Sequence, residues 1–169
     1  MDTYMVIFRI LHIFSSVIWV GAAAFLVFVV VPTTQRASTN GAPFVHNMYA
    51  NSPYPLMMVV SSIVTTVAGL ALYDRVSNHF NADWMFSGGG LVMTIGSVAG
   101  LLAFGHALFA LRKYTRQMGE LTEDMGNNPT GEQVSAFDHL AGKIKTNAYI
   151  SFGLMIIAVI GMSAARYIA

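Results

Sequence analysis

Two histidines lie inside long apolar stretches of the sequence, where an ionisable side chain is costly and indicates a functional site. His12 lies in the stretch 4–31, and His106 lies in the stretch 85–111. An imidazole between membrane helices can serve as an axial ligand of haem b. It can equally donate a hydrogen bond to a serine or a backbone carbonyl of a neighbouring helix. The sequence leaves both uses open for each histidine.

A cation accompanies each histidine on its own helix face. Arg9 stands one turn outward from His12, and Lys113 stands two turns outward from His106. Such cations suit the carboxylates of a haem, which lie near the membrane surface. The two histidines differ by about 10 Å in expected depth, so they are not expected to clamp one iron. Met93 or Met162 is the candidate second ligand near the depth of His12.

Small residues in the third apolar stretch offer room for a flat ring. Gly96 and Gly100 form a G-x-x-x-G pattern on the same helix as His106. This pattern can expose the flat helix surface that a porphyrin needs, but it is also the usual pattern where two membrane helices pack closely. We include both glycines in the candidate cofactor site.

The composition is that of a membrane protein. The chain has 169 residues, of which 55% are hydrophobic and 10% are charged, whereas a soluble domain carries about 25% charged residues. The net charge of +1 gives no electrostatic basis for binding nucleic acid. The chain contains no cysteine, which excludes disulfides, iron–sulfur ligation and thiolate metal sites within it. We expect an integral protein of a bacterial cytoplasmic (inner) membrane.

Four apolar stretches are long enough to cross a bilayer. They cover residues 4–31, 55–73, 85–111 and 147–165, and a cytoplasmic loop is expected at about 112–146. Backbone polar groups must be satisfied inside lipid, so we expect helices, arranged as one all-α antiparallel four-helix bundle over 1–169. Pro32 is expected to end the first helix, with a polar loop after it. Thr130 and Gln133 resemble a capping box, and helical extensions are expected on both sides of a turn at 126–131.

The distribution of cations predicts the orientation. Lys and Arg number three on the side of the termini and six on the other side. The positive-inside rule therefore places both termini on the non-cytoplasmic side. The N-terminus lacks the basic start of a secretory signal, so the first span is expected to remain in the protein.

The first span resembles a known family. The segment Leu11 to Gly21, L-H-I-F-S-S-V-I-W-V-G, resembles the first helix of CopD-like copper-resistance membrane proteins and of HemJ-type protoporphyrinogen oxidases. The likeness continues more weakly through Pro32, the glycine-rich third span and the segment K-I-K-T-N-A-Y-I-S at 143–151. HemJ-type proteins are four-helix membrane proteins that bind haem b through the histidine matching His12.

The resemblance implies specific roles and has specific departures. It implies that His12 is the prime haem ligand and Trp19 a pocket wall, and that Arg112 and Lys113 match functionally important basic residues. Position 22 is alanine where relatives often have a second glycine, and His106 falls outside the family pattern. The oxidase activity is therefore not carried over to this chain.

Three functions remain open at this point. The leading one is a membrane protein that binds haem b and passes electrons, linked to quinone, to porphyrinogen or to a redox partner protein. The second is copper handling, because Cu(I) favours thioether ligands. The methionines within spans are Met57, Met58, Met93, Met155 and Met162. The third is a cofactor-free accessory subunit of a larger membrane complex, and a homo-oligomer is a further candidate assembly.

Overall fold

The computed structural model describes residues 2–37, 41–125 and 129–168, and in these ranges the chain contains helices and no strand. Four helical segments are long and apolar enough to cross a membrane: Thr3–Ala37, Tyr54–Val76, Gly88–Asp124 and Gly131–Tyr167. The expected all-helical fold with four candidate spans is thereby confirmed.

The first long helix continues past the proline that was expected to end it. It comprises α1 (Thr3–Phe25), a π-helical turn η1 (Leu26–Val30) and α2 (Val31–Ala37). Pro32 has no backbone N–H, and its ring would clash with a carbonyl of the preceding turn in a regular α-helix. The wider π-helical turn directly before Pro32 provides room for the ring. Thr34 Oγ1 donates to the carbonyl of Val30 at 2.9 Å, so this part of the helix keeps its polar groups paired.

The expected polar loop after Pro32 also contains a helix of its own, α3 (Ala42–Ala50). The remaining elements are α4 (Tyr54–Val76), α5 (Ala82–Met85), α6 (Gly88–His106), η3 (Ala107–Leu111), α7 (Arg112–Asp124), α8 (Gly131–Ala164) and η4 (Ala165–Tyr167). Met85 ends α5, so the third long helix begins at Gly88 and not at Met85 as expected.

The expected helical extensions around residue 126 are confirmed. α7 prolongs the third long helix to Asp124, and α8 begins at Gly131. The Thr130 side chain accepts from the backbone N–H of Gln133 at 3.2 Å, and the Gln133 side chain accepts from the N–H of Thr130 at 2.9 Å, which confirms the capping box. The predicted turn at 126–131 lies partly outside the described residues.

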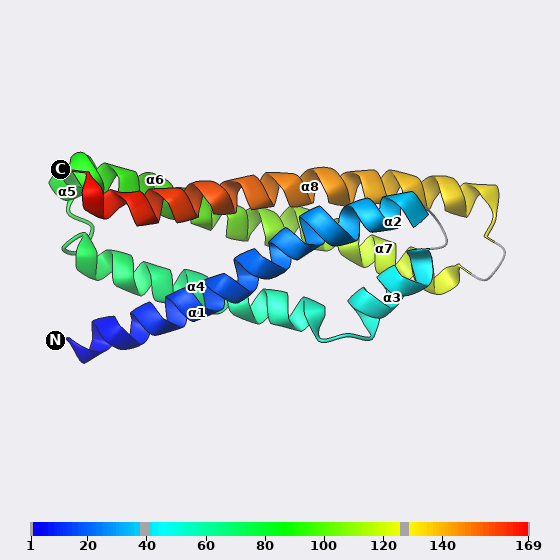
Figure 1. The fold of residues 1–169 in the computed structure, drawn as a ribbon, viewed down its shortest axis with the longest axis horizontal. Coiled ribbons are helices and arrows are strands. Elements are labelled where there is room, and N and C mark those ends of the chain that lie inside the picture. Colours follow the sequence, from blue (N-terminus) through cyan, green and yellow to red (C-terminus); the bar gives the residue numbers. More distant parts are fainter. Residues whose placement is uncertain (1, 38–40, 126–128, 169) are drawn as a thin grey trace.

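The long helices form two close pairs, α1 with α4 and α6 with α8, and both chain termini lie at the same end (Figure 1). Gly96 of α6 and Gly161 of α8 bring the second pair together, because a Cβ on Gly161 would lie 2.9 Å from the Cα of Gly96. The pairs are joined by a buried cluster of Trp19, Ala23, Ala103 and Met155. The first long helix also packs on α8 toward the end opposite the termini, where Leu26, Val30 and Ala148 are buried together. Room is left between the pairs toward the end with the termini.

Gly161→Ala is expected to destabilise the fold, because the added methyl group has no space against the backbone of α6. Overpacking of this kind costs about 1–3 kcal/mol. Gly153→Ala is the matched control on the same helix, since a Cβ there would meet nothing within 4 Å. Thermal unfolding in detergent should give a lower midpoint for Gly161→Ala and an unchanged or higher midpoint for Gly153→Ala, because alanine favours helix. Equal midpoints would contradict the close packing.

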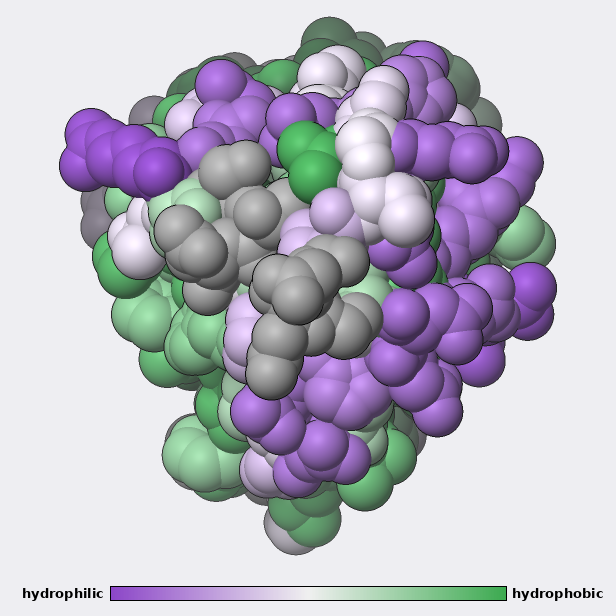
Figure 2. Space-filling model, turned by 90° about the vertical axis from the view of Figure 1, so that its right-hand side faces the viewer, coloured by the Kyte–Doolittle hydropathy of each residue, from purple (hydrophilic) through white to green (hydrophobic). Residues whose placement is uncertain are grey.

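The surface is divided between apolar flanks and a polar end. Large apolar side chains are exposed along the long helices, among them Phe14, Val17 and Phe109, and such extensive apolar exposure marks a membrane-facing surface. Figure 2 looks onto the end opposite the termini, where hydrophilic residues gather over much of the surface beside an apolar flank. The polar end is formed by the expected extensions, whose packing centres on buried Met118 and Phe137.

Candidate functional site

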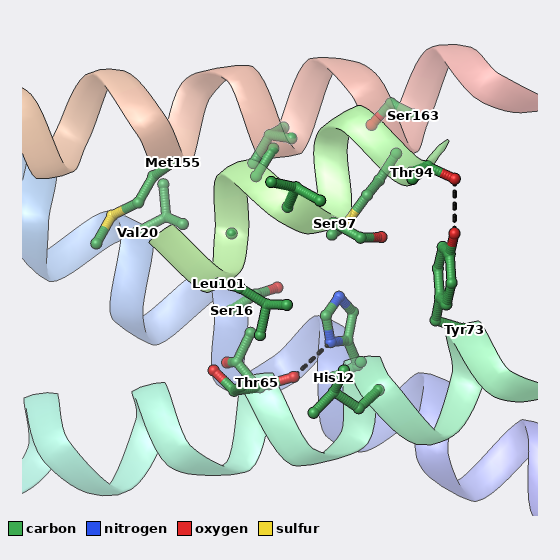
Figure 3. A pocket seen from close by; sticks show the side chains of 18 of the residues that line it. His12, Ser16, Val20, Thr65, Tyr73, Thr94, Ser97, Leu101, Met155 and Ser163 are labelled. Carbon is green, nitrogen blue, oxygen red and sulfur yellow. Dashed lines mark hydrogen bonds between the residues drawn. The ribbon is translucent and has the colours of Figure 1, made fainter. Parts of the chain in front are cut away.

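A cavity of about 500 Å³ lies between the two helix pairs and is lined by all four long helices (Figure 3). This volume falls within the range of cofactor and small-molecule sites, about 300–1,000 Å³. The wall residues include His12, Trp19, Gly69, Gly100 and Met155. His12 is the one titratable base in the wall, which contains no Lys, Arg, Asp or Glu. The cavity therefore suits a ligand whose main body is neutral.

The orientation of His12 leaves one ring nitrogen open to this cavity. Its Nδ1 lies 2.8 Å from the backbone carbonyl oxygen of Thr65. A carbonyl only accepts, so Nδ1 carries the hydrogen and, in the neutral ring, Nε2 carries the free lone pair. In Figure 3 this second nitrogen points away from α4 and toward α6. A histidine that donates Nδ1–H to a backbone carbonyl is arranged as metal-bound histidines are.

Close packing of α1 on α4 fixes this orientation. The His12 ring lies directly against Gly69, where a Cβ would come within 2.8 Å of Cε1 of the ring. One turn away, Thr65 Oγ1 donates to Ser15 Oγ at 2.8 Å, and Ser15 donates to the carbonyl of Leu11 at 2.6 Å. These contacts hold the two helices in one register, so the ring has one well-defined place.

The rest of the cavity wall is mainly apolar, with hydroxyl groups at a few positions. Tyr73 and Thr94 join α4 to α6 through a 2.6 Å contact between their oxygens (Figure 3). Thr94 Oγ1 also lies 2.7 Å from the carbonyl of Gly90, to which it donates, so Tyr73 is the donor in the pair. The hydroxyl-bearing residues Ser16, Thr66, Ser97 and Ser163 also line the wall. The wall is thus uncharged and mainly apolar, with hydrogen-bonding groups at a few positions.

Trp19 has an unsatisfied polar group at this site. Its side chain lines the cavity and is only 3% exposed, and its ring packs edge-on against Phe104. Its Nε1 has no hydrogen-bond partner among the described residues. A buried donor without a partner is unfavourable, but this nitrogen has almost no exposed surface and therefore does not open onto the cavity.

The structure brings together only some of the residues that the sequence singled out. His12, Trp19, Gly100 and Met162 line the cavity, whereas Met93 does not. Sequence analysis overlooked the α4 contribution, although Thr65 and Gly69 are one turn apart and so share a face.

The other candidate residues lie elsewhere. Arg9 is exposed and does not line the cavity, and Gly96 is buried against α8. His106 lies outside the cavity wall, and its Nδ1 lies 2.8 Å from Ser151 Oγ on α8. A hydrogen bond to a serine of a neighbouring helix is the alternative to haem ligation that the sequence left open. Lys113 is exposed, and its Nζ lies 5.8 Å from the ring centre of Tyr114. His12 and His106 therefore do not face one cavity.

Within the described residues, no three His, Cys, Asp or Glu side chains come together as a metal-binding group. An ion bound at His12 would need other ligands, and the methionines of the wall, Met85, Met155 and Met162, are the thioethers nearby. A porphyrin instead brings four nitrogen ligands of its own, so it needs only an axial ligand from the protein.

Comparisons with protein-family models, with curated proteins and with solved structures found no match to this chain. The resemblance to CopD-like and HemJ-type proteins therefore stays a prediction that rests mainly on Leu11 to Gly21.

Proposed function

We propose that this chain is an integral membrane protein that holds haem b through Nε2 of His12 and takes part in electron transfer. The observation that carries this proposal is the fixed ring of His12, whose Nδ1–H is donated to Thr65 while Nε2 faces a cavity of about 500 Å³. A lone histidine with no acidic or cysteine partner suits a cofactor that brings its other metal ligands. When bound, the haem would supply reversible one-electron chemistry.

Two features of the wall fit a haem, and a third limits how its carboxylates can be bound. Gly100 adds no side chain to the wall on α6, and Met155 or Met162 would be the candidate thioether ligands from the same wall. No cation lines the wall among the described residues, so hydroxyl groups of the wall would have to bind the haem carboxylates. The apolar parts of the wall would exclude water.

The membrane arrangement belongs to the same proposal. The four long helices cross a bacterial inner membrane in antiparallel order, with both termini on the non-cytoplasmic side. The excess of Lys and Arg at the opposite end supports this orientation. His12 then lies in the outer half of the membrane, and a quinone or a redox protein is the candidate electron partner.

An absorption spectrum tests the proposal. The purified protein from haem-replete cells should show a Soret band and, after dithionite reduction, a sharp α-band. A pyridine haemochrome assay should give one haem per chain, because His106 lies outside the cavity wall. A folded preparation without colour that takes up no added haem would refute the proposal.

Copper handling is a second candidate, favoured by the methionines that line the same cavity as His12. Met155 and Met162 bring thioethers to the cavity wall that also contains His12, and this soft ligand set suits Cu(I). Stoichiometric Cu(I) binding that is lost in a Met155→Leu and Met162→Leu double variant would support it. A colourless protein that binds no Cu(I) would count against both candidates.

A further inference from the structure

The connection between α4 and α5, residues 77–81, crosses from the first helix pair to the second at the end with the termini (Figure 1). Asn78, His79 and Asn81 are exposed polar residues, so most of this connection lies at the surface. Phe80 stands between them, is 52% exposed, and is the one residue of the connection that lines the cavity. An exposed polar connection thus carries one bulky apolar side chain into the wall.

The contacts of Phe80 place its ring at the end of the cavity nearer the termini, which we call the outer end. Its ring centre lies 5.6 Å from that of Tyr73. Tyr73 is joined to Thr94 of α6 by the hydrogen bond drawn in Figure 3. All three residues line the cavity. The wall at the outer end is therefore made of side chains from α4, from α6 and from the exposed connection.

The backbone of the connection holds Phe80 in an unfavourable conformation. Asn78, His79 and Phe80 have positive φ angles of 52°, 60° and 60° in succession. Asparagine tolerates this left-handed region, whereas a bulky side chain such as phenylalanine adopts it rarely and at an energetic cost. Such strain is typical of ligand clamps and switch regions. A return of Phe80 to a negative φ would relieve the strain and turn its ring out of its present place.

Few contacts hold the strained form. The N–H of Phe80 donates to Oγ of the buried Ser77 at 2.9 Å, and the N–H of His79 donates to the carbonyl of Asp74 at 2.8 Å. The Nδ1 of His79 also lies 3.1 Å from a carboxylate oxygen of Asp74. This pair lies at the surface, where an ion pair adds little stability. A small change in free energy is therefore enough to release the connection.

We propose that residues 77–81 form a gate at the outer end of the cavity, with Phe80 as the side chain that closes it, so that a ligand enters from the water on the side of the termini. This inference rests on the membrane placement proposed above but does not require the ligand to be haem. It assigns Phe80 to access, and it assigns Asp74 and His79 to holding the gate closed.

A thiol placed in the cavity provides the measurement, because the chain contains no cysteine. Ser97→Cys puts one thiol on the α6 wall of the cavity and serves as the parent. Ser87→Cys puts one on the exposed surface as an open reference. Full-length protein from haem-limited cells, in lipid nanodiscs, is treated with a permanently charged methanethiosulfonate reagent, which does not dissolve in lipid. The rate of mixed-disulfide formation, followed by mass spectrometry, reports opening of the cavity to water.

Substitutions at the connection then identify the gate. The thiol at position 97 should react about tenfold faster in Phe80→Ala than in the parent, since loss of the ring lowers the barrier to entry. Phe80→Leu keeps a bulky side chain and should react at nearly the parent rate. His79→Ala should raise the rate by a smaller factor. Phe86→Ala is the matched control and should leave the rate unchanged, because Phe86 is 72% exposed and does not line the cavity.

Each other outcome has a definite meaning. Equal rates in Phe80→Ala and the parent, or equal acceleration by Phe86→Ala, would overturn the gate. A parent whose thiol reacts as fast as the reference at position 87 would also overturn it, since the cavity would then stand open. Absence of reaction in the parent and in every variant would rule out entry from water. Acceleration by Phe80→Ala in a protein that takes up no haem would support the gate and refute the haem proposal.

Discussion

The proposed haem is expected to be absent from a folded His12→Ala protein. The substitution removes the Nε2 lone pair that faces the cavity, and no other histidine lines the wall to replace it. The absorption spectrum should lose its Soret band, with haem content falling below about a tenth of the parent value, because loss of an axial ligand removes the only bond from this side of the ring. The measurement is the haemochrome count per chain.

The controls separate ligation from folding. His106→Ala should keep the haem, because the Nδ1 of His106 lies 2.8 Å from Ser151 and its ring lies outside the cavity wall. His12→Gly with added imidazole should regain the Soret band, since free imidazole can occupy the space that the side chain leaves. Thermal unfolding of each apoprotein reports on stability alone. A His12→Ala protein with full haem content would show that the iron is held elsewhere.

The long helices were predictable because their apolar length is a local property of the sequence. The stretch 55–73 lies within α4, and the stretch 147–165 lies within α8 and η4. The course of the chain at Pro32 was not predictable, because a proline usually ends a helix and the π-helical turn that admits it carries no clear sequence signal. The helix α3 was also missed, since it has only 9 residues and Pro43, Asn51 and Pro53 near its ends are typical of a loop.

The site was predictable only where a side chain itself carries the chemistry. An intramembrane histidine is conspicuous, so His12 was found. Its partner is the backbone carbonyl of Thr65, and any residue type can supply a carbonyl. Gly96 was predicted to line the cofactor site, because the spacing of glycines suits either a bound flat ring or a closely packed helix. The contact between Gly96 and Gly161 shows that this glycine serves helix packing. Arg9 follows the stripe of His12 along α1 but does not reach the cavity wall.

Gly69→Ala is expected to disturb the site almost as strongly as removal of the histidine, although it deletes no functional group. The added Cβ would lie 2.8 Å from Cε1 and 3.0 Å from Nδ1 of His12, and both distances are too short for unbonded atoms. The ring must therefore move away from α4, which lengthens its 2.8 Å hydrogen bond to the carbonyl of Thr65. Loss of such a supporting contact weakens a metal ligand by about 10–100-fold.

A matched glycine shows whether the position or the substitution matters. Gly21 lies on α1, where a Cβ would meet nothing within 4 Å, so Gly21→Ala should leave haem affinity unchanged. Haem titration of both variants, with thermal unfolding of the apoproteins, distinguishes a displaced ring from a damaged fold. Equal affinity in Gly69→Ala and the parent would mean that ligand binding does not depend on the ring orientation fixed by Thr65. Weaker binding in Gly69→Ala alone would show that the affinity depends on the ring orientation of His12, which the carbonyl of Thr65 on α4 fixes.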